Sequence, residues 1–137
     1  MDINRKIKLK LETDIGLIKE EVFKKISPTN VKSIFLYGGY GRDEGSWIIE
    51  NNYVKPYNDY DIAIMVVKRV SPLVLKSIEK ELKKKVEVRW IDICQYTKIW
   101  LKLFRISIRN YDFKYASKCI YGEENFLRHI PNMDARS

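Results

Sequence analysis

The chain has 137 residues, of which 45% are hydrophobic and 12% aromatic, and its 26 Lys and Arg against 18 Asp and Glu give a formal net charge of +8. This composition can fill one hydrophobic core, excludes an intrinsically disordered chain and predicts one domain, residues 1–137. The positive charge favours anionic ligands such as nucleoside triphosphates or nucleic acid. Because the lysines are scattered along the sequence, a basic surface that only keeps the protein in solution explains the charge equally well.

Residue counts exclude two further classes of protein. The two cysteines, Cys94 and Cys119, and the single histidine, His129, do not have the spacing of a zinc site. No apolar run approaches the ~20 residues that cross a bilayer, and the N-terminus is charged throughout. We therefore expect a cytoplasmic protein with no membrane span and no signal peptide.

Hydrophobic periodicity predicts helices and strands along the first half of the chain. Residues 13–26 carry an apolar stripe and predict an amphipathic helix. Residues 31–37 are rich in branched and aromatic side chains and predict a strand that ends at a glycine pair. After a polar stretch over residues 47–57, residues 61–67 predict a second strand, which is apolar on both faces and therefore central in its sheet.

The second half continues the alternation. Ser71 and Pro72 have the pattern of a helix N-cap followed by proline in the first turn. Residues 86–93 predict a third strand, and residues 96–108 and 112–119 predict helices. Together these elements predict an α/β (α+β) fold in which a small mixed β-sheet is flanked by helices.

Two carboxylates at the start of the second strand are the most informative residues. Asp59 and Asp61 are two residues apart, so in a strand both side chains project from the same face. Two carboxylates this close repel unless a cation lies between them, and Mg²⁺ prefers oxygen ligands and leaves room for phosphate and water. The alternative is that both aspartates only cap a turn before the strand.

A glycine turn follows directly on the first strand. Gly38 and Gly39 lack Cβ atoms, so their backbone N–H groups can approach a phosphate closely, and Arg42 can add a guanidinium to the same phosphates. The sequence contains neither G-x-x-x-x-G-K-[ST] nor G-x-G-x-x-G, which argues against a P-loop NTPase and a Rossmann dinucleotide enzyme.

The segments LYGGYGRDEGSW and NDYDIAIMV together resemble the DNA polymerase β-like nucleotidyltransferase superfamily, and within it the small stand-alone domains related to the minimal nucleotidyltransferases. This resemblance implies the nucleotidyltransferase fold. It also implies that Gly38 and Gly39, with Arg42, bind the triphosphate, and that Asp59 and Asp61 bind a pair of metal ions. The metal would be Mg²⁺, with Mn²⁺ as a substitute.

The resemblance implies a third carboxylate on a neighbouring strand, and the sequence offers two. Glu87 is the preferred residue, as catalytic group and metal ligand, because it lies early in the expected strand between two valines. Asp92 is the alternative, on the opposite face of a regular strand, so only one of the two can face the aspartate pair.

The implied activity is transfer of a nucleoside monophosphate from an NTP, with ATP as the expected donor, to a hydroxyl acceptor with release of pyrophosphate. The acceptor is left open among protein, RNA and small molecules. Two alternatives remain: an antitoxin-like minimal nucleotidyltransferase that modifies a partner protein, and a catalytically silent module that binds NTP or nucleic acid.

Two features depart from the resemblance. Gly39 stands where many relatives have serine, and the twenty residues from Gly39 to Asp59 exceed the usual separation, so we expect a loop or hairpin beside the site. Among the aromatic residues, Tyr40 in the turn is the candidate for stacking on a base, whereas Trp90 alternates with Val88 and is expected in the core.

Overall fold

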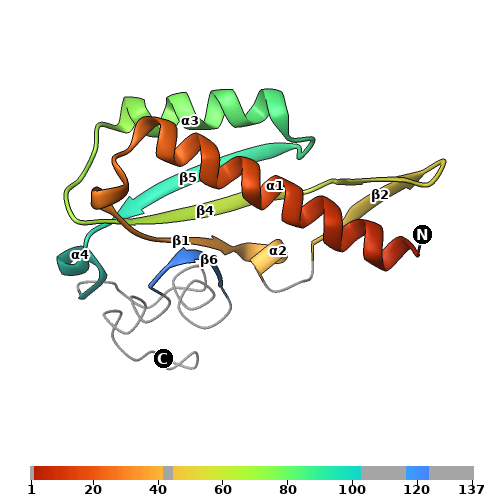
Figure 1. Ribbon diagram of the computed structural model, residues 1–137, viewed down its shortest axis with the longest axis horizontal. Helices are drawn as coiled ribbons and strands as arrows, with labels where there is room; N and C mark the ends of the chain where they lie inside the picture. Colours follow the sequence, from red (N-terminus) through yellow and green to blue (C-terminus); the bar gives the residue numbers. More distant parts are fainter. Residues whose placement is uncertain (1, 42–44, 103–116, 124–137) are drawn as a thin grey trace, which may run out of the picture.

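The computed structural model describes residues 2–41, 45–102 and 117–123, and within them the chain forms a four-stranded sheet and a separate two-stranded hairpin (Figure 1). The helices are α1 (Ile3–Lys25), α2 (Gly38–Gly41), α3 (Pro72–Lys85) and α4 (Lys98–Lys102), with a 3-10 turn η1 (Pro28–Asn30). The strands are β1 (Val31–Tyr37), β2 (Trp47–Glu50), β3 (Tyr53–Pro56), β4 (Asp59–Val66), β5 (Trp90–Tyr96) and β6 (Lys118–Gly122).

The four-stranded sheet is mixed, as the sequence predicts. Its order is β5-β4-β1-β6; β1 pairs antiparallel with β4 and with β6, and β4 pairs parallel with β5. Helix α3 makes the crossover between the two parallel strands. The prediction of an α+β fold with helices flanking a small mixed sheet is confirmed.

One face of the sheet carries the main hydrophobic core. Alternate residues of β4, from Tyr60 to Val66, pack against buried side chains of α1 and α3, and both helices lie on this side of the sheet in Figure 1. The opposite face has a smaller buried apolar cluster of Phe35, Tyr37, Ala63 and Met65. The remaining alternate positions of β4, Asp59 and Asp61, therefore belong to the face away from α1 and α3.

The extension between Gly39 and Asp59 is a hairpin. Strands β2 and β3 pair antiparallel, and the two residues between them, Asn51 and Asn52, have positive φ angles of 49° and 65°. Asparagine tolerates this backbone conformation, and the two-residue turn that it permits matches the twist of paired strands. The predicted loop or hairpin is thus confirmed as a hairpin, which projects from the sheet at the end where β4 begins (Figure 1).

Three elements differ from the sequence prediction by more than two residues or in type. Helix α1 begins at Ile3, ten residues before the expected residue 13, because the Asp2 side chain caps it by accepting from the Asn4 N–H at 3.3 Å. Strand β5 begins at Trp90, not at residue 86, since its ladder with β4 starts where Trp90 pairs with Asp59. Residues 118 and 119, expected at the end of a helix, instead begin β6, which pairs with β1; residues 112–116 lie outside the described part of the chain.

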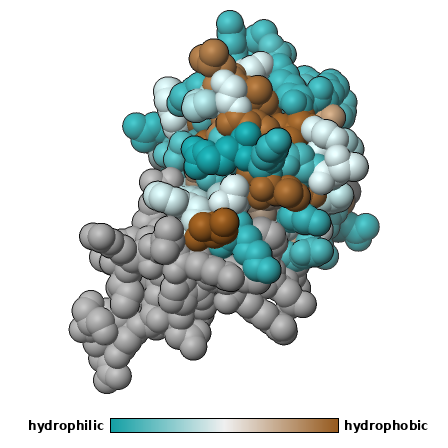
Figure 2. All heavy atoms as spheres, turned by 90° about the vertical axis from the view of Figure 1, so that its left-hand side faces the viewer, coloured by the Kyte–Doolittle hydropathy of each residue, from teal (hydrophilic) through white to brown (hydrophobic). Residues whose placement is uncertain are grey.

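The described surface on the face shown in Figure 2 is mainly hydrophilic. In Figure 2, which looks onto the end of the molecule with α4 and the β4–α3 connection, hydrophobic side chains lie in separate patches among hydrophilic ones. Within the described residues, no helix is both long and apolar enough to cross a bilayer.

Candidate active site

Strand β4 presents Asp59 and Asp61 on the face of the sheet that α1 and α3 leave uncovered. Their neighbour Tyr60 is fully buried in the core on the other face, which fixes the orientation of the strand. Asp59 is exposed and Asp61 is half-buried. The sequence prediction that both carboxylates share one face of one strand agrees with this geometry.

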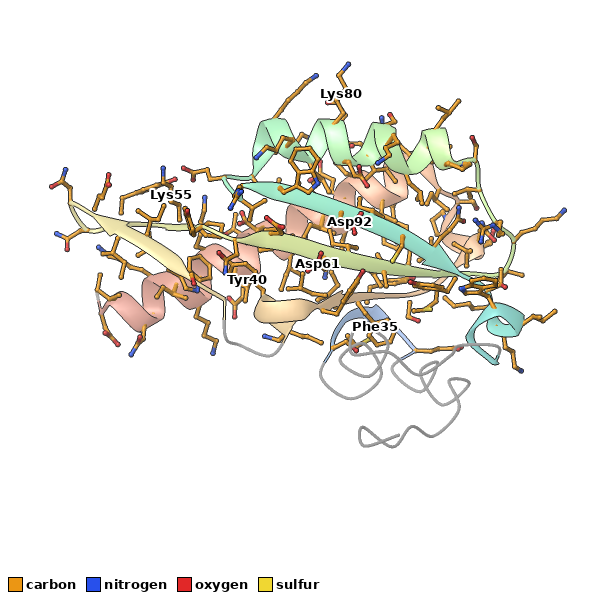
Figure 3. The ribbon with its side chains drawn as sticks, turned by 180° about the vertical axis from the view of Figure 1, so that it is seen from behind. Phe35, Tyr40, Lys55, Asp61, Lys80 and Asp92 are labelled. Atoms are coloured by element: carbon orange, nitrogen blue, oxygen red, sulfur yellow. The ribbon has the colours of Figure 1, made fainter. Side chains whose placement is uncertain are left out.

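Asp92 is the third carboxylate that the sheet brings to this face. In the parallel ladder of β4 and β5, Asp92 pairs with Asp61, and its neighbours Ile91 and Ile93 are buried in the core on the opposite side. Adjacent strands are about 4.8 Å apart, so paired residues carry their side chains next to each other on the same face. Figure 3 shows Asp61 and Asp92 on neighbouring strands.

The structure does not bring Glu87, the residue preferred from the sequence, to the aspartate pair. Glu87 precedes β5, and its carboxylate accepts a hydrogen bond from the Lys10 ammonium at 2.8 Å and another from the Tyr53 hydroxyl. Lys10 holds the pKa of this carboxyl below its usual range. The placement of Glu87 in a regular strand was wrong because Val86 and Val88 are buried by packing, without joining the sheet ladder.

The glycine turn lies directly against Asp61. Gly38 begins α2 immediately after Tyr37, which pairs with Asp61 across the β1–β4 ladder. Gly38 has φ +73°, and a Cβ atom there would stand 2.5 Å from the Asp61 Oδ2 atom. Only glycine fits this position, so the backbone of the turn approaches the carboxylate face closely. Gly39 follows within α2, and Arg42 lies outside the described residues.

Comparison with known proteins agrees with this arrangement. No family model matches the chain, and no curated protein matches it by sequence. Among solved structures, it is similar to a toxin–antitoxin with AMP-PNP, at 14% identity and a TM-score of 0.58 over 83% of this chain and 77% of that chain. It is also similar to a spectinomycin adenyltransferase from Enterococcus faecialis with ATP and spectinomycin, at 15% identity and a TM-score of 0.60 over 90% of this chain and 60% of that chain.

A third similar structure is a tri-AMPylated Shewanella oneidensis HEPN toxin in complex with MNT antitoxin, at 13% identity and a TM-score of 0.55 over 83% of this chain and 74% of that chain. The chain has the nucleotidyltransferase fold. At these identities the likeness concerns the fold, and the chemistry must be argued from the residues that this fold brings together.

Tyr40 is buried within the fold and offers no exposed ring for stacking. The sequence favours Tyr40, in the turn, as a residue that stacks on a base, which requires an exposed ring. The side chain is only 2% exposed. Its hydroxyl donates to the Ser46 carbonyl at 2.6 Å and accepts from the N–H groups of Tyr57 and Asn58, at 3.1 and 3.0 Å. Tyr40 therefore fastens α2 to the segment that leads into Asp59, and burial raises the pKa of its hydroxyl.

A buried Asp–Tyr pair lies directly behind the aspartates of this fold. The Tyr60 hydroxyl donates to the Asp14 Oδ2 atom at 2.7 Å, and both residues are fully buried. The other carboxylate oxygen, Asp14 Oδ1, has no hydrogen-bond partner in the described structure. Burial raises the pKa of Asp14 and also that of Tyr60. The sequence reasoning missed this pair, although Asp14 lies four residues before Ile18, on the apolar stripe of α1.

The donor set suits magnesium that arrives with phosphates. Within the described residues, no group of three or more His, Cys, Asp or Glu side chains is gathered closely enough to hold a metal ion by itself. Mg²⁺, however, is ordinarily held by one or two carboxylates together with substrate phosphates and water. Asp61 and Asp92 lie at paired positions, Asp59 is two residues before Asp61, and the Gly38 backbone lies alongside Asp61. Together these groups provide a set of this kind.

Proposed function

We propose that this protein is a nucleotidyltransferase that transfers a nucleoside monophosphate from an NTP, with ATP as the preferred donor, to a hydroxyl acceptor. The observation that carries the proposal is the parallel register that pairs Asp61 with Asp92 beside the Gly38 turn. Carboxylates on one sheet face supply the metal ligands, and the adjoining glycine backbone supplies donors for phosphate, so both halves of a metal–triphosphate complex have a place.

The residues divide the work of the reaction among them. Asp59, Asp61 and Asp92 would hold two Mg²⁺ ions, or Mn²⁺ in their place, together with phosphate and water. The metal would polarise the α-phosphate and activate the acceptor hydroxyl. Gly38 and Gly39 would direct backbone N–H groups at the triphosphate, and Arg42 would add charge-assisted hydrogen bonds. In this reaction the acceptor hydroxyl oxygen attacks the α-phosphorus and forms a new P–O bond, the bond to the departing pyrophosphate breaks, and the hydroxyl proton passes to water.

The nucleotide preference is argued from similar structures. Two of them were crystallised with ATP or AMP-PNP, and an adenine nucleotide is therefore the first donor to test. A partner protein is one candidate acceptor, since a structure similar to this chain contains an AMPylated toxin in complex with an antitoxin. In that role the protein would transfer AMP to a side-chain hydroxyl of its partner.

Labelled nucleotides test the proposal. The protein is incubated with Mg²⁺ and each α-labelled NTP in turn, first alone and then with cell extract, and labelled products are separated by size and by sensitivity to protease and nuclease. We expect a labelled acceptor and released pyrophosphate with the wild-type protein and neither with Asp61→Asn. Tight NTP binding without pyrophosphate release under any condition would overturn the proposal in favour of a silent binding module.

A further inference from the structure

A basic groove runs along the edge of the sheet, between α3 and the edge strand β5. It has a volume of about 340 Å³ and is lined by Lys76, Glu79, Lys80, Lys83, Trp90 and Ile91. Ligand sites in proteins begin at about 300 Å³, so the groove can hold a group as large as a nucleobase. None of these residues has a part in the reaction proposed above.

Trp90 is the aromatic wall of this groove. The sequence placed it in the core, but the structure leaves 63% of it exposed, whereas Val88 is buried. Trp90 is exposed because β5 begins at this residue and its side chain is on the face of the strand away from the core. The next residue, Ile91, is on the core side. An indole this exposed adds little to the stability of the fold, and its face is open to a ligand.

The lysines form a row along α3. Positions 76, 80 and 83 follow the helical repeat and span about 10 Å of the helix axis. Lys80 makes no ion pair within the described part of the chain, and it rises from α3 above β5 in Figure 3. Lys83 donates to two carbonyl oxygens, those of Val88 and Arg89, so its charge is positioned without being neutralised by a carboxylate.

The single acid of the groove does not cancel this charge. Glu79 Oε1 lies 3.3 Å from the Lys76 ammonium, while Glu79 Oε2 accepts the backbone N–H of Ile93 at 3.0 Å. Glu79 thus ties α3 to the edge strand. Three ammonium groups against one carboxylate leave the groove with a net positive charge beside an exposed aromatic face.

One residue of the groove, Trp90, lies close to the candidate active site along the sheet. Trp90 pairs with Asp59 in the parallel ladder of β4 and β5, and Asp92 follows Trp90 by two residues on the same strand. Two residues of a strand span about 6.6 Å, and side chains at this spacing share a face. A ligand that contacts Trp90 therefore lies within about one nucleotide of the carboxylates.

We propose that this groove binds a single-stranded nucleic acid, with a base stacked on Trp90 and phosphates along the lysines of α3, and that this strand carries the acceptor hydroxyl. Stacking platforms beside a positive groove are how proteins hold single strands without reading their sequence. In the reaction, a ribose hydroxyl oxygen bonds to the α-phosphorus of the NTP, pyrophosphate leaves as its bond to that phosphorus breaks, and the hydroxyl proton passes to water. The identity of the acceptor rests on the proposed function, whereas the binding does not.

Fluorescence anisotropy without nucleotide tests the binding. Labelled single strands of about 12 nucleotides, one of RNA and one of DNA, are titrated over a range of salt concentrations with wild type, Lys76→Ala/Lys80→Ala and Trp90→Ala. The matched control is Lys68→Ala/Arg69→Ala, which removes the same charge beyond the opposite end of β4. We expect the lysine variant to reduce the slope of log affinity against log salt by about 1.4, and Trp90→Ala to weaken binding about 5- to 150-fold.

The control should bind as wild type does. If the groove variants also bind as wild type does, or if polyglutamate displaces the strands as effectively as unlabelled oligonucleotide, the binding inference is overturned and the proposed function is untouched. Transfer is then measured with α-labelled NTP and Mg²⁺. The oligonucleotide should become labelled by wild type and not by Asp61→Asn, and comparison of the RNA and DNA strands shows which of the two is the acceptor. If a protein in the extract becomes labelled and neither oligonucleotide does, the acceptor assignment is overturned. If no molecule becomes labelled, the proposed function is overturned instead.

Discussion

Removal of one buried hydroxyl behind the active site, by Tyr60→Phe, should destabilise the protein strongly. The Tyr60 hydroxyl is the hydrogen-bond donor to Asp14 at 2.7 Å, and Asp14 Oδ1 has no other partner in the described structure. The variant leaves a fully buried carboxyl without any described donor, which costs about 2–3 kcal/mol of unfolding free energy. In urea this corresponds to a midpoint lower by roughly 1 M.

A second tyrosine provides the matched control. Tyr53 also donates its hydroxyl to a carboxylate, that of Glu87, but Tyr53 is 51% exposed and Glu87 is exposed. Tyr53→Phe should therefore change the unfolding free energy by less than about 0.5 kcal/mol. In the Tyr60→Phe background, Asp14→Ala should cost less than it does alone, because it removes the carboxyl that the first substitution leaves without a donor.

The destabilisation should also depend on pH, in a direction that the structure fixes. Burial raises the pKa of Asp14, while the Tyr60 hydrogen bond and the charge of Lys10 oppose that rise and the charge of Glu87 adds to it. Tyr60→Phe raises this pKa further, and the stability gained by protonating Asp14 is present at low pH and lost as pH rises through the folded-state pKa. The loss of stability relative to wild type should therefore be larger at about pH 7.5 than at about pH 5. An unchanged urea midpoint, or a loss of equal size at both pH values, would refute this account of the buried pair.

Two other sites make contrasting predictions. Gly38→Ala places a Cβ 2.5 Å from Asp61 Oδ2 at φ +73°, so it should lower the unfolding free energy by about 1–3 kcal/mol and weaken Mg²⁺-dependent ATP binding. The control Gly16→Ala, in open space on α1, should raise the unfolding free energy by up to about 1 kcal/mol. Equal shifts of the thermal unfolding temperature in the two variants would contradict the close approach of Gly38 to Asp61. Lys85, 2.6 Å from the buried Glu21, holds the pKa of that carboxyl below its ordinary 4.5, so the stability from this pair is present above pH 4.5 and lost as pH falls through the lowered value. Glu21→Gln should accordingly flatten the acid side of the stability–pH curve, and a curve parallel to that of wild type would count against the pair.

Features set by local periodicity could be predicted from the sequence. Asp59 and Asp61 share a face because side chains alternate along any strand, and the Gly38 turn follows because a hydrophobic strand stops at two glycines. The hairpin between Gly39 and Asp59 likewise follows from Asn51 and Asn52, which accept a positive φ angle.

Features set by register and packing could not be predicted. Which acid joins Asp61 depends on where β5 enters the sheet, and the valines around Glu87 have the same alternating pattern whether or not they join a ladder. Tyr40 looked exposed because a glycine-rich turn gives no sign that its hydroxyl would receive two backbone N–H groups. Trp90 looked buried because it is an apolar residue in an alternating segment, which is the pattern of a core residue. The sequence does not show that its strand lies at the edge of the sheet.

The pairing of Asp92 with Asp61 is the centre of the account, and one comparison tests it directly: Mg²⁺-dependent nucleotidyl transfer by Asp92→Asn against that by Glu87→Gln. Asp92→Asn should lower the rate by about 100-fold or more, because it removes a metal ligand, while Glu87→Gln should stay within about threefold of wild type, because it loses only the ion pair with Lys10 at the surface. Loss of transfer in Glu87→Gln with near-normal transfer in Asp92→Asn would contradict the account.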